Sequence, residues 1–280
     1  MNIGPYKLRS VITSHFALDG GAMFGVVPKT LWSKSAEVDE LNRISMVTRT
    51  LLLESADKKI LIDTGNGDKW QPRFKEMFKI DVDGYILHES LQKMGVQVEE
   101  ITDVICTHLH FDHVGGNTRL VNGVLEPSFP NARYWIQREN FELANHPNDK
   151  DRASYLSENW ELLRENGMLE ILNGEQELFE GIRLEIVHGH TRGQQLPVIS
   201  DGHNTIIYGG DLFPMKTHIP IPWIMAYDNE PLLSAAEKKR ILPGLLDRDA
   251  SIFFEHDPAT VACKLLATEK GIVGGQDLSL

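Results

Sequence analysis

The stretch from Val104 to Gly116 constrains the fold of this chain more than any other. Its opening Val-Ile-Cys run is typical of a buried strand. Four side chains capable of binding metal then follow within six residues: His108, His110, Asp112 and His113. Imidazole nitrogens and carboxylate oxygens suit zinc and other first-row transition metals, and the two glycines that follow allow a tight turn. The sequence therefore predicts a metal site at a strand end.

The spacing H-x-H-x-D-H favours two metal ions over one. The adjacent residues Asp112 and His113 point in different directions from His108 and His110, so we expect one ion for each pair. A single histidine is more often an ordinary polar residue than a ligand, but four candidates at this spacing make that interpretation a poor one.

Composition narrows the classes of function. The 280 residues are 41% hydrophobic, enough for a large core, and the formal net charge of −12 provides no basic surface for nucleic acid. Only two cysteines occur, so we expect no disulfide framework. We find neither a signal-peptide pattern at the start nor an apolar run of membrane-spanning length. The expectation is a cytoplasmic protein with no membrane or nucleic-acid partner.

The pattern of apolar residues predicts alternating strands and helices in one domain. We expect Asp19 to Gly25 to be a flexible loop, because glycine is frequent there. Strands are expected at 6–14, 45–54, 59–62, 101–107, 134–136, 183–187, 195–200, 205–208 and 251–254. Helices are expected at 81–95, 138–145 and 231–246, with another around 156–163.

Three further strand ends carry candidate ligands, namely His190, Asp211 and His256. Together with Asp63-Thr64-Gly65 after an early strand, the order of motifs resembles the metallo-β-lactamase superfamily. The resemblance covers essentially the whole chain. It implies an α/β fold, the αββα four-layer sandwich of that superfamily, formed as a single hydrolase domain over residues 1–280.

The resemblance also implies a ligand set for two divalent metal ions, with zinc expected and iron, cobalt or manganese as alternatives. The first ion would take His108, His110 and His190, and the second Asp112, His113 and His256, with Asp211 bridging both. We choose His190 over His188 because Thr191 and Gly193 follow it, as the family pattern requires. Asp63 would orient a ligand from behind.

Within the superfamily, the chain most resembles quorum-quenching N-acyl-homoserine-lactone lactonases, in particular the YtnP-like branch. The stretches that carry this resemblance lie outside the metal motifs, at 20–28, 31–34 and 223–228. One position departs from the pattern: the better-known lactonases have a tyrosine three residues after the bridging aspartate, and this chain has Pro214.

The resemblance implies a hydrolase that opens the lactone ring by attack of a metal-bridging hydroxide, with Asp112 or Asp211 carrying the proton afterwards. His218 is a candidate replacement for the missing tyrosine. The acyl chain needs apolar contacts, for which the candidates are Met23, Phe24, Phe111, Trp223, Ile224 and Met225.

Two other functions remain open at this point. One is phosphotriester or aryl-ester hydrolysis, as in relatives similar to methyl parathion hydrolase. The other is a metal-binding or redox protein without hydrolytic activity. The lactonase resemblance further implies a homodimer, with part of its contact around residues 26–32.

Overall fold

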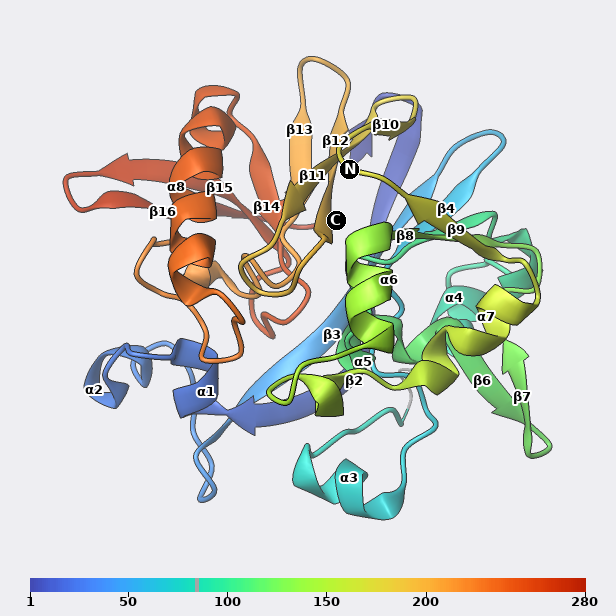
Figure 1. Ribbon diagram of the computed structural model, residues 1–280. Helices are drawn as coiled ribbons and strands as arrows, with labels where there is room; N and C mark the ends of the chain where they lie inside the picture. The colour runs from blue at the N-terminus through green and yellow to red at the C-terminus, as the bar shows by residue number, and fades with distance from the viewer. Residues whose placement is uncertain (84–85) are drawn as a thin grey trace. The chain divides into compact units, whose positions relative to one another are not determined.

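The computed structural model describes residues 1–83 and 86–280, which form two compact units. Unit 1 contains Met1–Phe16 and Val47–Gly174, and unit 2 contains Ala17–Met46 and Glu175–Leu280. Figure 1 shows the strands and helices of both units along the chain. Each unit is described by itself below.

Unit 1 is built on a seven-stranded sheet with the order β1-β2-β3-β4-β5-β8-β9. The strands β4, β5, β8 and β9 run parallel, whereas β3 and β4 are antiparallel. Residues 17–19 at the end of β2 and residues 43–46 at the start of β3 belong to unit 2. The strand bounds are β1 Asn2–Ile3, β2 Tyr6–Asp19, β3 Arg43–Glu54, β4 Lys59–Ile62, β5 Asp103–Ile105, β8 Arg133–Gln137 and β9 Leu169–Leu172.

Short helices and one hairpin complete unit 1. Their bounds are α3 Pro72–Met77, α4 Leu87–Lys93, α5 Phe111–Val114, α6 Arg138–Asn145 and α7 Glu161–Glu165, with the hairpin β6 Thr118–Val121 and β7 Val124–Pro127. The 3₁₀ turns are η1 Val98–Glu100, η2 Gly115–Asn117, η3 Arg152–Ser154 and η4 Ser157–Asn159. The predicted helix at 138–145 is confirmed, and the one at 81–95 is shorter, although its residues 84–85 lie outside the described residues.

The core of unit 1 forms where helices pack on the parallel strands. Buried side chains of β5 and β8, such as Val104 and Tyr134, share one apolar cluster with Leu91 of α4 and Leu163 of α7. Burying apolar area in this way is the main source of the unit's stability. The strand that leads into the His108 region is buried along its whole length and is held by this cluster.

Unit 2 contains a second seven-stranded sheet, with the order β10-β11-β12-β13-β14-β15-β16. All neighbouring strands in it are antiparallel except β13 and β14, which run parallel. The bounds are β10 Glu177–Phe179, β11 Ile182–Val187, β12 Gln194–Ser200, β13 Thr205–Tyr208, β14 Ser251–Phe253, β15 Ala262–Thr268 and β16 Gly271–Leu278.

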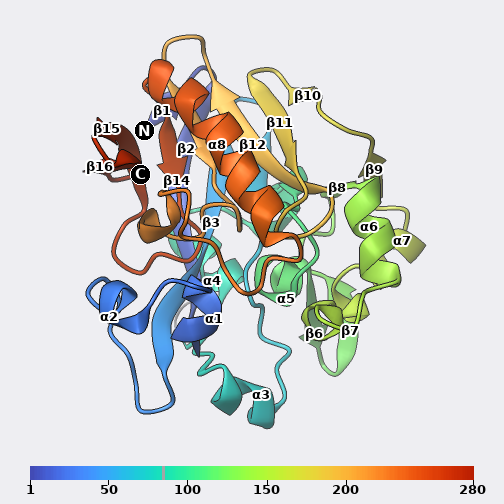
Figure 2. The ribbon, with the colours of Figure 1, turned by 60° about the vertical axis from the view of Figure 1, so that its left-hand side comes forward.

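The parallel pair in unit 2 requires a crossover, and helix α8 (Pro231–Asp247) lies in it. Figure 2 shows α8 lying across the sheet. Its residues Ile241, Leu242 and Leu245 pack into one cluster with Val187 of β11 and Ile207 of β13. The helix predicted at 231–246 is confirmed. Unit 2 also holds the short helices α1 (Gly20–Phe24) and α2 (Lys29–Trp32) and the turn η5 (Lys216–His218).

The expectation of a flexible loop at Asp19 to Gly25 was wrong, because this segment forms helix α1. The Asp19 carboxylate caps the helix by accepting the Ala22 N–H at 2.8 Å. Gly25 ends it with a φ of +55°, and a Cβ at Gly25 would lie 2.7 Å from the carbonyl oxygen of Ile224. The glycines permit this close packing rather than flexibility.

Among the residues that the structure describes, no helix is long and apolar enough to cross a membrane.

Replacing Gly25 with alanine should destabilise unit 2 by about 2–3 kcal/mol, because a strained backbone and a steric clash act together. The matched control is Gly202→Ala. Gly202 also has a positive φ of +87°, but a Cβ there would meet nothing within 4 Å. We expect this control to lose about 1 kcal/mol from backbone strain alone. Urea unfolding measures the loss of stability of both variants, and equal midpoints for the two would contradict the proposed clash.

Candidate metal centre

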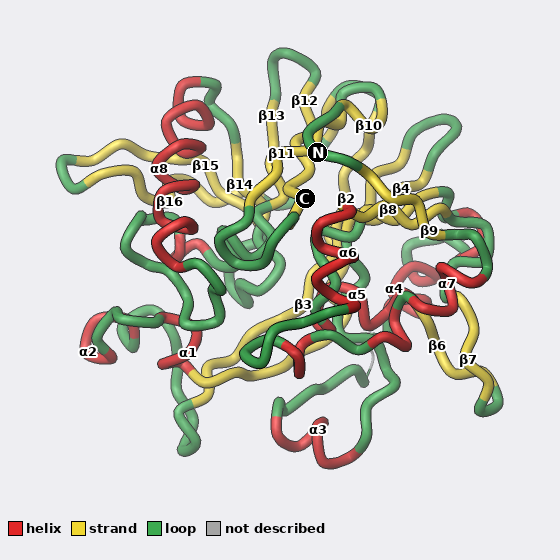
Figure 3. Tube along the Cα trace, in the orientation of Figure 1, coloured by secondary structure: helices red, strands yellow, loops and turns green. Residues whose placement is uncertain are grey.

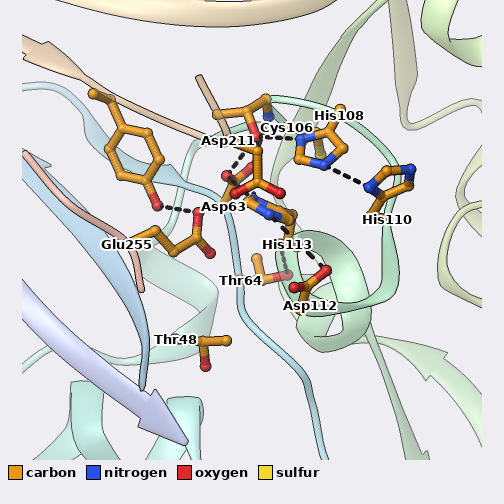
Figure 4. Close-up of polar contacts among 12 residues, drawn as sticks. Thr48, Asp63, Thr64, Cys106, His108, His110, Asp112, His113, Asp211 and Glu255 are labelled. Carbon is orange, nitrogen blue, oxygen red and sulfur yellow. Dashed lines mark hydrogen bonds and ion pairs between the residues drawn. The ribbon is translucent and has the colours of Figure 1, made fainter. Parts of the chain in front are cut away.

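The histidines of the H-x-H motif lie at the end of β5 in unit 1. His108 Nε2 and His110 Nδ1 are 3.0 Å apart, and their rings meet edge to face. Figure 4 shows these two nitrogens facing each other. His108 is fully buried and His110 is 6% exposed. Two imidazoles so placed share at most one proton between them, whereas a metal ion would accept both lone pairs.

Asp112 and His113 follow on the one-turn helix α5. The rings of His108 and His113 are 4.0 Å apart between centroids, and His113 Nε2 lies 3.9 Å from Asp112 Oδ1. The structure therefore brings all four predicted side chains of this motif together within unit 1. We call His108, His110, Asp112 and His113 the unit 1 cluster.

The Asp63 carboxylate lies behind the unit 1 cluster and is fully buried. Its Oδ2 is 3.0 Å from His113 Nδ1 (Figure 4). The same Oδ2 accepts the Thr107 hydroxyl at 2.7 Å, and Oδ1 accepts the Thr107 N–H at 2.7 Å. With Nδ1 directed at a carboxylate, His113 is left with Nε2 as its ligand atom. Sequence reasoning missed Thr107, whose position beside His108 was the only signal.

Close backbone contact holds the loop after Asp63 against the end of α5. The Thr64 N–H donates to the His113 carbonyl oxygen at 2.7 Å. A Cβ on Gly67 would lie 2.2 Å from the Gly115 carbonyl oxygen, so no side chain fits there. The glycines after the histidine motif thus serve the close approach of two loops as well as the predicted turn.

Cys106 is also close to this cluster, but its sulfur is not a ligand candidate. Burial raises the pKa of its thiol to about 12. The side chain is fully buried, and the Asn117 amide contacts its Sγ at 3.5 Å. A protonated thiol neither binds a metal ion nor acts as a nucleophile at neutral pH.

In unit 2, the predicted ligands come from loops at the ends of β11, β13 and β14. Asp211 Oδ2 lies 3.1 Å from His190 Nε2, and its Oδ1 lies 3.2 Å from His256 Nε2. All three side chains are buried. The structure therefore brings these predicted residues together, and we call them the unit 2 cluster.

The choice of His190 over His188 agrees with these contacts. His188 Nδ1 instead accepts the N–H of Gly193 at 3.2 Å. Burial by itself would lower the pKa of His190, but the carboxylates of Asp211 and Asp228 outweigh it and raise the pKa to about 9. A cation, whether a proton or a metal ion, is therefore strongly favoured between His190 and Asp211.

Two carboxylates near His190 were not predicted as site residues. Asp228 Oδ1 lies 3.0 Å from His190 Nδ1. The Glu237 carboxylate, from α8, accepts the backbone N–H groups of His188 at 2.7 Å and Gly189 at 3.1 Å. Asp228 ends the 223–228 stretch noted in the sequence, but nothing in a single sequence indicates that it meets His190.

Phe111 is the one apolar pocket candidate in unit 1, and an aromatic group surrounds it. Its ring lies 5.1 Å from Trp70 and 5.5 Å from Phe78 between centroids, and Phe78 stacks on Phe74. Phe74 is 39% exposed, and helix α3, which carries it, buries none of its residues. Figure 3 shows α3 with loop on both sides. The exposed end of this aromatic group was missed from the sequence.

The other pocket candidates lie in unit 2, and several belong to its interior. Met23, Phe24 and Met225 are each no more than 3% exposed. Trp223 and Ile224 are half-buried. Phe24 stacks on Trp32 with ring centroids 5.1 Å apart. Met23, Phe24 and Met225 therefore contribute to packing in the state described.

His218 is fully buried and stacks on Phe24. Its Nε2 lies 2.9 Å from the Met23 carbonyl oxygen and therefore carries the proton. Burial, followed by the charge of Lys238, lowers the pKa of His218 to about 4. The ring is thus neutral, and Nδ1 keeps its lone pair. Lys238 Nζ donates to the carbonyl oxygens of His218 and Trp223 at 2.7 and 2.6 Å, which fixes this loop.

Both clusters fit divalent transition-metal ions. The donors are imidazole nitrogens and carboxylate oxygens, they are buried, and they point at one another at 3.0–3.9 Å within each unit. Each of the seven residues offers a ligand atom within 4.8 Å of at least two other such atoms, a spacing at which a metal ion can be held. Such donors favour zinc, iron, cobalt or manganese over calcium or magnesium.

Comparison with known proteins agrees with this chemistry. The N-acyl homoserine lactonase of Bacillus cereus is 27% identical over 229 residues, which cover 77% of this chain and 83% of that protein. A probable metallo-hydrolase of Mycobacterium tuberculosis is 24% identical over 277 residues, covering 85% of each chain.

Solved structures share the fold. A probable metal-dependent hydrolase from Staphylococcus aureus matches with a TM-score of 0.89 and 28% identity, covering 99% of this chain and 100% of that one. The dizinc quorum-quenching lactonase AidC, in complex with a product, matches with a TM-score of 0.80 and 22% identity, covering 100% of this chain and 97% of that one. The family model of the metallo-β-lactamase superfamily matches residues 46–246. The chain is a metal-dependent hydrolase that belongs to the metallo-β-lactamase superfamily.

Proposed function

We propose that this protein opens the lactone ring of N-acyl-homoserine lactones at a dinuclear metal centre. The observation that carries the proposal is the pair of buried His/Asp clusters, one in each unit, with the Asp211 carboxylate directed at two imidazoles. The substrate class is supported by the lactonases among the relatives. In this proposal the two units act as one catalytic domain over residues 1–280.

The proposed assignment of ligands follows the family pattern. One metal ion would be held by His108, His110 and His190, and the other by Asp112, His113 and His256. Asp211 would bridge them. Two such ions lower the pKa of bound water towards neutrality and polarise a carbonyl group. We propose zinc as the native metal.

The side chains around the ligands have separate proposed roles. Asp63 holds His113 so that Nε2 is available. Asp112 is 7% exposed and Asp211 is 8% exposed, so both carboxylates are buried but keep a small exposed surface. We assign the transfer of a proton to the leaving alkoxide oxygen to Asp112 or Asp211.

The acyl chain would lie against the aromatic group around Phe111. Phe111 sits between the ligands His110 and Asp112, so a chain resting on it is tethered near the reacting carbonyl. Trp70 and Phe78 extend the same surface outward. Alkyl chains gain about 0.8 kcal/mol for each methylene group that such a surface buries.

Pro214 has a definite contact in place of the phenol found in the better-known lactonases. Its carbonyl oxygen accepts the N–H of His256 at 3.0 Å, so it holds the backbone of a proposed ligand. In this proposal the metal ions and Asp211 suffice without a phenol. His218 is not the substitute that we favour, because it is fully buried and its Nε2–H is bound to Met23.

We also propose that the protein is a cytoplasmic homodimer. Val26 is 85% exposed and Leu31 is 50% exposed, whereas Trp32 is buried at 1%. Apolar side chains so exposed at residues 26–31 favour a protein contact there. Light scattering on the eluted protein would measure the mass, and a monomer at all concentrations would reject the dimer.

Metal-loaded protein should open acyl-homoserine lactones at neutral pH, and a chelator should abolish the activity. Ring opening releases a proton, so a pH indicator follows it directly, and chromatography identifies the product. Phosphotriesters and aryl esters are tested beside the lactones. Turnover of those compounds alone would replace the proposed substrate class, and a fully metallated protein that turns over none of them would favour a redox or binding function.

Loss of a proposed metal ligand should remove metal and activity together. We expect Asp211→Asn and His113→Ala each to bind fewer than two metal ions per chain and to lose at least about 10²-fold in kcat/KM. The control is Asp249→Asn, which breaks only an exposed ion pair with Lys264. Metal analysis and kinetics are measured on the same samples. Full activity with a single metal ion would rule out a two-metal reaction.

Removing an aromatic ring beyond Phe111 should weaken binding of long acyl chains more than short ones. For Phe78→Ala we expect KM for a decanoyl lactone to rise about 10-fold, with a much smaller rise for a butanoyl lactone. Leu266→Ala, at a 53% exposed side chain of β15, is the control. An equal rise for both substrates would place the acyl chain elsewhere.

A further inference from the structure

The His190 imidazole is held at both of its nitrogens within unit 2. Nε2 lies 3.1 Å from Asp211 Oδ2, and Nδ1 lies 3.0 Å from Asp228 Oδ1. His190 is 2% exposed and Asp228 is 4% exposed, so water does not compete for either contact. The ring therefore has one nitrogen directed at a proposed metal ligand and the other at a carboxylate outside the ligand set.

We propose that Asp228 is a positioning residue that sets the tautomer and the orientation of His190 for metal binding. This inference rests on the proposed metal centre. Because a carboxylate oxygen only accepts, Nδ1 carries a proton toward Asp228. Nε2 faces Asp211 and is protonated as well in the metal-free protein, so a metal ion that displaces this second proton would take the Nε2 lone pair. A negative charge at Nδ1–H also makes Nε2 a stronger donor to a metal ion.

The backbone around His190 is fixed by other groups. The Glu237 carboxylate accepts the N–H groups of His188 and Gly189, and the N–H of Asn229 donates to the His190 carbonyl oxygen at 3.0 Å. The position of the loop is therefore held without the Asp228 side chain. Asp228 contacts the imidazole ring itself and Glu237 contacts the backbone, which makes the two roles separable by mutation.

Asp228 is itself held in place through the segment before it. The N–H of Ala226 donates to the carbonyl oxygen of Ala22 at 2.8 Å, and Gly25 packs directly on the backbone of Ile224. Helix α1 thus anchors residues 224–226, and Asp228 follows two residues later. A carboxylate on an anchored segment can select one ring orientation, whereas one on a mobile loop could not.

The test compares Asp228→Ala and Asp228→Asn with the wild-type protein. Zinc affinity is measured by competition with a chromogenic chelator, and the tautomer of His190 by the ¹⁵N shifts of its ring in the zinc-loaded protein. We expect Asp228→Ala to lower the affinity for one zinc ion by about 10- to 100-fold. The proton should also no longer be fixed on Nδ1 of His190. Asp228→Asn keeps an acceptor but no charge, so it should retain the tautomer of His190 and lower the zinc affinity by a smaller factor.

Glu237→Gln serves as the comparison, because it disturbs the backbone of the same loop and not the ring. It should lower the midpoint of thermal unfolding and leave the proton on Nδ1 of His190. It should lower the zinc affinity less than Asp228→Ala does. Wild-type zinc affinity in both Asp228 variants, or an equal loss in Glu237→Gln, would overturn the proposal. If Asp228→Ala does not fold, Asp228→Asn decides: an unchanged affinity rejects the role of the charge.

Zinc binding and the ring tautomer are measured without any substrate. If the wild-type protein binds zinc but opens no lactone, the proposed function fails while the assignment of Asp228 is still decided by these readouts.

Discussion

The buried Asp63 carboxylate is the contact on which the metal-binding part of unit 1 depends. It accepts two hydrogen bonds from Thr107 and lies against His113, so it joins the end of β4 to the loop that follows β5 and to α5. A buried carboxylate is costly unless hydrogen bonds or a positive charge compensate for it. The same contacts that stabilise Asp63 therefore hold the histidines in their mutual arrangement, and its φ of +58° directs the chain into the glycine loop.

Unit 2 meets the same cost with a different arrangement. There two carboxylates, Asp211 and Asp228, face the single imidazole of His190. Helix α8 adds Glu237, whose negative charge is matched by two backbone N–H groups, and burial raises the pKa of that carboxyl. The long crossover between β13 and β14 thus does more than cover a sheet. It carries the groups that place a ligand loop.

The sequence predicts the local part of this picture well and the long-range part poorly. The strands at 45–54 and 59–62 and the helices at 138–145 and 231–246 have strong apolar patterns, and the structure contains them. The H-x-H-x-D-H residues are found together because a turn at a strand end leaves them few alternatives. Asp228 and Trp70 could not be found in this way, since each meets its partner across 38 or more positions of the chain. Helix α1 was missed because its glycines serve packing rather than flexibility. The β15–β16 hairpin was missed because the apolar residues of its strands do not alternate with polar ones.

The chemistry of Cys106 has a consequence for how robust the cluster is. Burial raises the pKa of its thiol to about 12, so the thiol stays protonated at neutral pH. Sulfur is a strong ligand for zinc and is readily oxidised, yet here it is fully buried in the core cluster of unit 1, with the Asn117 amide on its Sγ. The protein therefore keeps a sulfur atom near its metal ligands in the less reactive thiol form.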